Sequence, residues 1–292
     1  MAKVLLTKRI EFSASHRYYN EAWDAVRNRQ VFGACSHASG HGHNYLLEVT
    51  VEGDIAEETG MVVNLYDLKQ VLKLVLQEFD HKHLNLDTNY FTTKIPTTEN
   101  IAGVLWSVLA THAEIGQLKK IRLFEEDDLY ADVTAACFSE GEVLTRASLT
   151  RRYHFSAAHR LGDHQGPNIT GGVWGKCRSP HLHGHNYTLQ VTVGGKINPD
   201  TGMVTDLSAL DRTVHDRVLQ RFDYRNLNED PDLSRSGTTG VHVTRFVWDA
   251  LVTSMPGGQL ERIGLAETAD ISYEYQEETT SVGEQVIVNQ GR

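Results

Sequence analysis

"SGHGHNYLLEVTVEG" (residues 39–53) joins two histidines, one residue apart, to an alternating run of apolar and polar residues. Nearly the same phrase, "HLHGHNYTLQVTVGG", returns at residues 181–195. Alternation with a period of two is typical of a strand with one buried face, and alternate side chains of a strand point to the same face. The sequence therefore predicts a strand in each half of the chain that begins with a pair of histidines on one face.

The repeat extends far beyond this phrase. "RIEFSASHR" (9–17) returns as "RYHFSAAHR" (152–160), and "TGMVVNLYDL" (59–68) returns as "TGMVTDLSAL" (201–210). The two copies of each segment lie 142 or 143 residues apart. Solenoid repeats are at most about 50 residues long, so a repeat of this length indicates the duplication of a whole domain. The expected parts are a first domain at residues 1–137, a second domain at 145–277 and a flexible tail at 278–292.

Composition narrows the class of protein. The chain has 292 residues, of which 40% are hydrophobic and 23% charged, as in ordinary globular proteins. A net charge of −10 disfavours nucleic acid and anionic membrane surfaces as partners. The sequence lacks a long apolar run and a signal-peptide pattern, and its three cysteines are too few and too scattered for a disulfide framework. We therefore expect a cytoplasmic protein without a membrane partner.

Each half reads as two strands, two helices and two strands. Asn64 can cap a helix in "LYDLKQVLKLVLQEF", and Thr97 begins the capping pattern of "TTENIAGVLWSVLATHA". The predicted class is α+β, with a four-stranded antiparallel sheet and two helices on one face in each domain. The other face and the sheet edges then need cover. We expect sheets to join edge to edge into a closed β-barrel in a homo-oligomer.

The histidines favour a metal site in each half. His16 ends the strand before the phrase, where an antiparallel neighbour would place it beside His41 and His43. Three converging imidazoles suit zinc and leave a fourth position open. A single histidine would more often be a polar surface residue, but this set is repeated. The second set consists of His159, His183 and His185.

Cysteine and an acidic pair accompany these histidines. Cys35 and Cys177 each lie six residues before the first histidine of a pair. A lone cysteine is often inert packing, but the repeated position favours a reactive thiol at Cys35. Asp80 can orient His81 for proton transfer, or His81 can simply interact with the dipole at the end of a helix.

Two further carboxylates occupy corresponding positions at the end of an apolar strand. Glu125 and Glu267 are either charges of a hairpin turn or carboxylates that accept hydrogen bonds from the N–H groups of a flat heterocycle. The residues alone leave both interpretations open.

"FSASHR", C-x5-HGHNY, "TGMVVNLYDLK", "DHKHLN", "TTEN" and the acidic strand end, in this order, resemble the 6-pyruvoyl-tetrahydropterin synthase family. The resemblance covers nearly all of residues 3–136 and, less completely, 145–277. It implies two tandem tunnelling-fold (T-fold) domains, barrels made of three sheets, and two barrels stacked head to head. It also implies one zinc ion on each histidine set, hence two Zn²⁺ per chain.

The resemblance further implies a carbon–oxygen lyase of tetrahydrobiopterin biosynthesis. Such enzymes eliminate triphosphate from 7,8-dihydroneopterin triphosphate and give a 6-pyruvoyl product. The implied proton-transfer group is Cys35, Asp80 and His81, and the implied pterin contacts are Thr97, Thr98, Glu99 and Glu125. Five residues between Cys and HGH favour this branch over the 6-carboxytetrahydropterin synthases of queuosine-type pathways. That enzyme, and a zinc-stabilised pterin-binding protein with little turnover, are the alternatives.

The second half departs from the pattern. Tyr224 replaces the histidine of the Asp-His pair, and a tyrosine with a pKa near 10 is a poor proton carrier at neutral pH. "TTGVHVTRFVW" (238–248) replaces "TTENIAGVLW" (97–106) and carries one extra residue. We therefore expect activity mainly in the first domain. Cys177 and Asp223 are weaker catalytic candidates, and Glu267 is a candidate pterin contact.

The sequence differences between the two halves also bear on how the chains assemble. Glu125 and the Thr97–Glu99 segment are retained in the same half as Cys35 and His81. This favours rings that each contain one kind of half. The expected assembly is a trimer of tandem chains or a higher oligomer, with two stacked rings.

Overall fold

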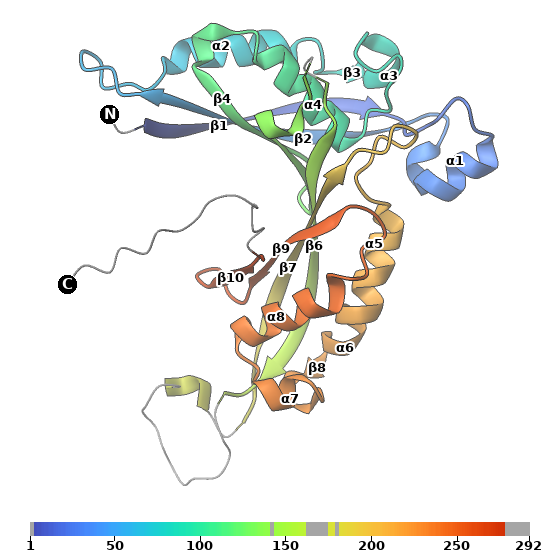
Figure 1. Ribbon diagram of the computed structural model, residues 1–292, viewed down its shortest axis with the longest axis vertical. Helices are drawn as coiled ribbons and strands as arrows, with labels where there is room; N and C mark the ends of the chain where they lie inside the picture. The colour runs from blue at the N-terminus through green and yellow to red at the C-terminus, as the bar shows by residue number, and fades with distance from the viewer. Residues whose placement is uncertain (1–2, 141–142, 162–174, 179–180, 278–292) are drawn as a thin grey trace.

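The computed structural model describes residues 3–140, 143–161, 175–178 and 181–277. Two similar halves lie next to each other in one continuous sheet. The first half, blue to green, crosses the top of Figure 1, and the second half, yellow-green to red, runs below it. The expected tail at 278–292 lies outside the described residues.

The sheet contains ten strands, and its order is β10-β9-β7-β6-β5-β4-β2-β1-β3, with β8 beside β6. The first half supplies β1 (Lys3–His16), β2 (His41–Asp54), β3 (Lys82–His83), β4 (Gln117–Glu126) and β5 (Leu129–Val133). The second half supplies β6 (Arg146–His159), β7 (His183–Lys196), β8 (Arg225–Asn226), β9 (Gln259–Ala266) and β10 (Ser272–Tyr275). Neighbours are antiparallel, except that β3 is parallel to β1 and β8 to β6. Each half thus has the four predicted strands plus one two-residue strand, and the sheet is open within one chain.

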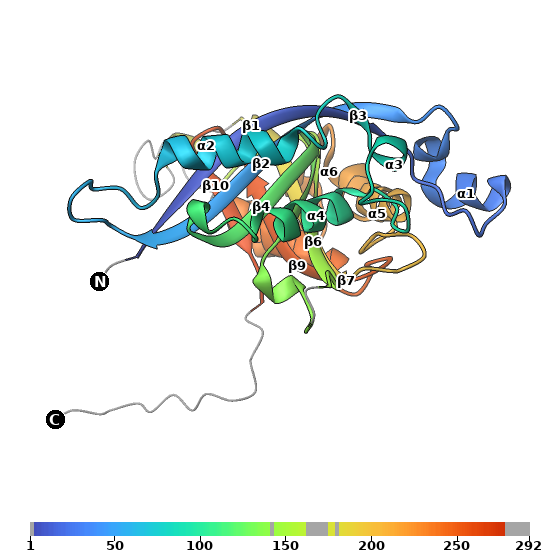
Figure 2. The ribbon, with the colours of Figure 1, turned by 90° about the horizontal axis from the view of Figure 1, so that it is seen from above.

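Helices cover one face of the sheet (Figures 1 and 2). The first half has α1 (Ala25–Phe32), α2 (Leu65–Leu76), α3 (Leu84–Asp87) and α4 (Thr98–Leu109). The second half has α5 (Leu207–Val214), α6 (Gln220–Phe222), α7 (Leu233–Ser236) and α8 (Gly240–Leu251), with a π-helical turn at His215–Leu219. Short 3₁₀ turns lie at Gly33–Ser36, Ala113–Ile115, Ala135–Cys137, Gly175–Arg178 and Leu227–Glu229. In the part of the chain that the structure describes, no helix has the length and apolar character that crossing a bilayer requires.

The two predicted helices of the first half begin where their caps predict. Asn64 accepts a hydrogen bond from the backbone N–H of Tyr66, and α2 follows. Thr97 accepts one from the backbone N–H of Asn100, and α4 follows. A side-chain acceptor at this position satisfies one of the free N–H groups of the first helical turn.

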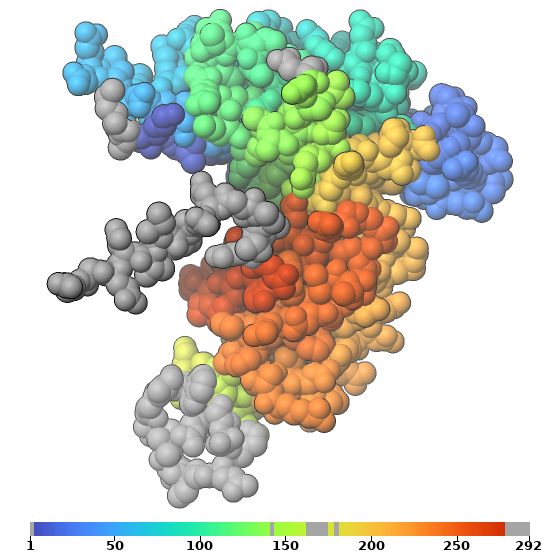
Figure 3. Space-filling view, viewed as in Figure 1, coloured from blue at the N-terminus to red at the C-terminus, as the bar shows by residue number. Residues whose placement is uncertain are grey.

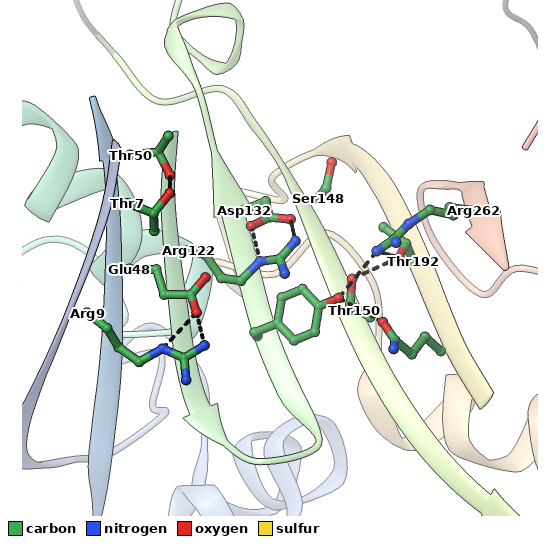
Figure 4. Close-up of polar contacts among 12 residues, drawn as sticks. Thr7, Arg9, Glu48, Thr50, Arg122, Asp132, Ser148, Thr150, Thr192 and Arg262 are labelled. Carbon is green, nitrogen blue, oxygen red and sulfur yellow. Dashed lines mark hydrogen bonds and ion pairs between the residues drawn. The ribbon is translucent and has the colours of Figure 1, made fainter. Parts of the chain in front are cut away.

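The two faces of the sheet differ in chemistry. Tyr45, Leu47 and Val49 of β2 are fully buried on the face that the helices cover. The opposite face carries polar pairs across neighbouring strands, such as Arg9 with Glu48, and Arg122 with Asp132 (Figure 4). The helix-covered face therefore holds the core, whereas no described helix covers the polar face.

The halves meet edge to edge. Residues 129–132 of β5 pair with residues 148–151 of β6, antiparallel. Arg151 Nη1 lies 2.9 Å from Asp128 Oδ1 at this joint, and Tyr130 Oη donates to Gln190 Oε1. The expectation that each ring contains one kind of half is therefore wrong, because the two halves of a chain share one sheet.

Candidate metal centre and its surroundings

Strand register brings the first histidine set together. His16 lies opposite His41 in the pairing of β1 with β2, and His43 follows two residues later on the same face. The ring centroid of His16 lies 4.6 Å from that of His41 and 5.1 Å from that of His43. One ligand atom of each ring lies within 4.8 Å of the others.

The second half repeats this geometry. His159 lies opposite His183 in the pairing of β6 with β7, and His185 lies on the same face. The ring centroid of His159 is 4.5 Å from that of His183 and 5.1 Å from that of His185. The three candidate ligand atoms again lie within 4.8 Å of one another.

Hydrogen bonds orient the buried ring of each set. His16 Nδ1 lies 2.9 Å from the backbone oxygen of Pro96, and His159 Nδ1 lies 2.7 Å from that of Thr238. A carbonyl can only accept, so the proton belongs on Nδ1, and the Nε2 lone pair is free for a metal. Burial lowers the pKa of both His16 and His41 to about 4. These rings are therefore neutral at neutral pH, as metal ligation requires.

Three ring nitrogens of the two histidine sets are left without a hydrogen-bond partner. His43 Nε2, His159 Nε2 and His183 Nδ1 are buried and have no hydrogen bond among the described residues. An unsatisfied buried polar atom is costly, and ligation of a cation would remove that cost. Three converging imidazoles with free lone pairs thus fit a metal ion in each half.

Glu125 connects the first histidine set to the start of α4. Its Oε1 lies 3.6 Å from His43 Nε2 and 4.0 Å from His16 Nε2. Its Oε2 accepts hydrogen bonds from Tyr18 Oη, at 3.0 Å, and from Thr98 Oγ1, at 2.5 Å. The residue is buried at the end of β4 and is not an exposed charge of the hairpin turn.

Cys35 lies in the 3₁₀ turn before β2 and packs with Tyr18 and Phe32. Burial, followed by the charges of Glu125 and Glu126, raises the pKa of its thiol to about 11. A thiolate here therefore needs a nearby positive charge. Cys177 lies in the corresponding turn of the second half, whereas Cys137 is buried in the 3₁₀ turn after β5 and packs in the core.

Asp80 and His81 lie at the end of the α2 segment, outside the histidine set. Asp80 Oδ1 accepts from the backbone N–H of Ser13 and lies 3.0 Å from His81 Nδ1. The bond from Ser13 is the main cause that lowers the pKa of Asp80. His81 has φ +57°, which is uncommon for a non-glycine residue, and its side chain is 81% exposed. The imidazole faces outward, into an open hollow of about 570 Å³ that His43 also lines.

The second half keeps this backbone but changes the side chain. Asp223 Oδ1 accepts from the backbone N–H of Ser156, and Tyr224 has φ +55°. The Tyr224 side chain is 86% exposed.

The start of α8 corrects one alignment made from the sequence. Thr239 is the N-cap of α8, and α8 and α4 have the same length of 12 residues. Thr239 therefore corresponds to Thr97, and the expected extra residue in this segment is wrong. Gly240 then stands in the position of Thr98, and an exposed Val241 in that of Glu99.

A tyrosine fills the space beside Glu267. Tyr273 Oη donates to Glu267 Oε2 at 3.1 Å, and Tyr187 Oη donates to Oε1 at 3.2 Å. A Cβ atom on Gly240 would lie 2.0 Å from the Tyr273 ring. The ring thus takes the place that the Thr98 side chain has in the first half. Both oxygens of Glu267 already accept hydrogen bonds within the chain.

Tyr18 is a site residue that sequence reasoning missed. It follows His16 by two residues, but its counterpart in the repeat is Leu161, so the duplication gives no signal for it. Its pKa is raised well above the usual value by burial and by Glu125. Tyr45 was missed as well, although it lies two residues after His43, and its Oη is 3.1 Å from His16 Nδ1.

The chain is similar to known proteins in sequence and in structure. The family model described as 6-pyruvoyl tetrahydropterin synthase matches residues 5–136 and again residues 148–278. The 6-pyruvoyl tetrahydrobiopterin synthases of Pongo abelii and Homo sapiens are 44% and 43% identical over 124 residues, which is 42% of this chain and 86% of each relative. The solved 6-pyruvoyl tetrahydropterin synthase of Caenorhabditis elegans is 33% identical, with 44% of this chain and 91% of that chain covered and a TM-score of 0.41.

Proposed function

The chain belongs to the 6-pyruvoyl tetrahydropterin synthase family, and we propose that its first half is a zinc-dependent lyase that eliminates triphosphate from 7,8-dihydroneopterin triphosphate. The observation that carries this proposal is the link from the three imidazoles through Glu125 to Thr98. This link joins a metal site to a carboxylate that can accept the N–H groups of a pterin ring. The product would be the 6-pyruvoyl compound of tetrahydrobiopterin biosynthesis, made in the cytoplasm.

Zinc is the proposed metal in both halves. His16, His41 and His43 would hold one ion, and the corresponding histidines of the second half would hold another. Bound zinc would supply a Lewis acid that polarises the substrate hydroxyls and makes the adjacent C–H acidic. Its positive charge would also lower the pKa of the Cys35 thiol.

The remaining groups divide into binding and proton transfer. Glu125 and the Thr97–Glu99 segment would hold the pterin ring. Cys35 Sγ would take a proton from the substrate side chain, and His81 Nε2 would return one, with its Nδ1 held by Asp80. Because the described contacts join His81 to no residue of the second half, and its side chain faces outward, we propose that it completes a first-half site of another chain in a homo-oligomer. Since neighbouring halves within one sheet are unlike, that chain would belong to a second ring stacked on the first.

The second half would bind zinc with little turnover. Tyr224 replaces the proton-transfer imidazole, and Val241 replaces Glu99. Tyr273 occupies the space beside Glu267. Each change removes a different part of the proposed machinery.

The function is tested by incubation of the full chain with 7,8-dihydroneopterin triphosphate and identification of the product by mass spectrometry. We expect the 6-pyruvoyl product. Cys35→Ala should lower kcat by at least about 100-fold, the range of general acid–base contributions, while zinc content is kept. Cys177→Ala is the matched control and should keep most activity. A carboxypterin plus acetaldehyde would identify the queuosine-type enzyme instead, and an unchanged substrate would leave a pterin-binding protein.

Metal analysis tests the second part of the proposal. The purified chain should approach two zinc ions per chain, and His43→Ala should remove one of them, as should His185→Ala. A folded, active and metal-free preparation would contradict the zinc proposal. Mixed oligomers of Cys35→Ala chains with His81→Ala chains should regain part of the activity if the site spans two chains. A lack of recovery in verified mixed oligomers would instead assign the whole site to one chain.

A further inference from the structure

A segment of the second half lies against the candidate site of the first half. Residues 200–204 belong to the connection between β7 and α5. This connection is part of the yellow segment in Figure 3, which lies between α1 and the rest of the first half. Met203 is buried there and packs with Tyr18 and Phe32, and Cys35 borders the same cluster. The second half thus reaches the residues that surround Glu125.

Two side chains of the α4 start are bound by the backbone of this segment. The N–H of Val204 donates to Glu99 Oε1 at 2.9 Å, and Thr97 Oγ1 donates to the carbonyl oxygen of Gly202 at 2.7 Å. Both Thr97 and Glu99 are buried. Because the Thr97 proton is directed to Gly202, a lone pair of the hydroxyl is free to accept the N–H of Asn100, which forms the helix cap. The second half therefore fixes both the cap and the carboxylate.

The same motif in the first half makes no such contact. The chain repeats "TGMV" at residues 59–62 and 201–204. Met61 is 50% exposed, whereas Met203 is 6% exposed. A Cβ on Gly60 would meet nothing within 4 Å, whereas a Cβ on Gly202 would lie 2.7 Å from Asn100 Nδ2 and 3.1 Å from Thr97 Cγ2. Among the described residues of one chain, only the second copy of the motif contacts a candidate site.

We propose that the second half is a positioning element for the first: the backbone of Gly202 and Val204 holds Thr97 and Glu99 in the orientation that binds the pterin ring. This inference rests on the proposed function for the identity of the ligand. It gives the second half a role that its own catalytic residues do not require. A half that has lost Thr98, Glu99 and His81 equivalents still has to keep the Gly202–Val204 backbone in place.

The test compares Gly202→Ala with the matched control Gly60→Ala. Both glycines have positive φ, +73° and +67°, so each substitution strains the backbone alike. Only Gly202→Ala places a methyl group against Asn100 and Thr97. The probe is neopterin, a fluorescent pterin without the triphosphate. We expect Gly202→Ala to raise its Kd and the KM of the substrate about tenfold, equal to about 1.4 kcal/mol, with less than a twofold fall in kcat. Gly60→Ala should change the Kd less than twofold.

Folding and zinc content are measured in both variants. Equal Kd values in Gly202→Ala and the unsubstituted chain would overturn the proposal, and so would an equal weakening by Gly60→Ala. An unsubstituted chain that binds no neopterin would overturn the proposed function and this inference together. Neopterin binding without turnover of the triphosphate would overturn the function alone.

A double variant traces the contact itself. Asn100→Ala removes the amide that the new methyl group would meet at 2.7 Å. In Gly202→Ala/Asn100→Ala we expect the loss of affinity to be smaller than the sum of the two single losses, because contacting residues are coupled. Strictly additive losses of affinity would show that Gly202→Ala acts through contacts other than the one with Asn100, and would contradict the proposal.

Discussion

Single residues in this chain are tuned by burial as much as by neighbours. His16 and His41 are kept neutral because the folded chain desolvates them, and the same cause acts on Glu99, whose pKa burial raises to about 7. A carboxyl with a raised pKa binds its proton more tightly in the folded state than in the unfolded state. Its contribution to stability is therefore full below pH 4.5 and is lost as the pH rises through 7.

The substitution Glu99→Gln tests whether Glu99 lowers the stability of the folded chain as the pH rises. The glutamine keeps an oxygen that can accept the Val204 N–H but carries no charge. We expect its advantage in the free energy of unfolding over the unsubstituted chain to be about 1–3 kcal/mol larger at pH 9 than at pH 5. Urea unfolding at the two pH values measures it. Glu58→Gln, on an exposed side chain, is the control and should show no such difference. An advantage of the same size at both pH values would contradict the burial of a charged Glu99.

At this scale, the sequence predicted what strand geometry determines. Two histidines one residue apart must share a face, and a third at the end of the neighbouring strand must lie beside them. Tyr18 was out of reach, because it follows the end of β1 and approaches Glu125 only through the fold of the connecting segment. In a strand, the spacing of residues in the sequence determines which face their side chains share. In a loop it does not.

At the scale of elements, the two halves differ in where the larger side chain stands. It lies at the start of the helix in the first half and on the last strand in the second half. In the first half, Ala131 of β5 is the counterpart of Tyr273, and Thr98 begins α4. In the second half, Tyr273 of β10 occupies the corresponding position and Gly240 begins α8. Each half thus combines one small residue with one larger residue at these two positions, and in the second half the larger one fills the space beside the carboxylate.

This exchange predicts the number of pterin sites. The unsubstituted chain should bind one neopterin per chain, because the Tyr273 ring occupies the second site. Tyr273→Ala should raise the stoichiometry toward two, since it empties that space and frees Glu267 Oε2. Tyr273→Phe removes only the hydroxyl and should leave the number at one. Fluorescence titration of concentrated protein measures the stoichiometry. Two sites in the unsubstituted chain would contradict the assignment of Tyr273 as a plug.

Helices with strong caps and periodic leucines were predictable, and α2 and α4 are where the sequence placed them. The register of α8 was not, because two adjacent threonines, Thr238 and Thr239, can each cap a helix. The structure selects Thr239, whose Oγ1 accepts the N–H of His242, while the carbonyl of Thr238 is used by His159. The choice depends on a tertiary contact that the local sequence does not contain.

At the scale of the whole molecule, the joint between the halves was not predictable from the linker. Twelve residues separate Val133 at the end of β5 from Arg146 at the start of β6, and an extended chain of that length spans about 40 Å. Such a linker could place the second half in the same ring or in another one. The pairing of β5 with β6 settles that within one chain.

The joint also indicates how chains associate. The sheet has two unpaired edges, β10 at one end and β1 with β3 at the other. By the repeat, β10 corresponds to β5 and β1 to β6, which are the strands that pair within the chain. Lys8 and Asp270 correspond to Arg151 and Asp128, the ion pair of the joint. Leu5 on β1 is 61% exposed and lacks the cover that β6 has. Edges of this kind favour association.

We therefore predict that β10 of one chain pairs with β1 of the next, in the register of the internal joint, so that first and second halves alternate around a ring. Thr150 lies opposite Tyr130 at the joint, and their counterparts are Thr7 and Ser272. A Thr7→Cys/Ser272→Cys chain should therefore form a disulfide between chains on mild oxidation, because facing Cα atoms in a sheet are close enough for one. Thr7→Cys/Glu274→Cys shifts the pair by two residues and should cross-link far less.

The three native cysteines are present in both variants, so the comparison isolates the new pair. The unsubstituted chain should have a mass in solution of at least twice 32.7 kDa, since a head-to-tail contact needs a second copy and closes only as a ring. Two chains would supply four T-fold units to that ring, and any larger ring would contain an even number of them. A monomer in solution, or equal cross-linking by the matched and shifted pairs, would contradict the alternating ring. A ring of three T-fold units would contradict it too, because each chain would then have to divide its halves between rings and break the β5–β6 joint.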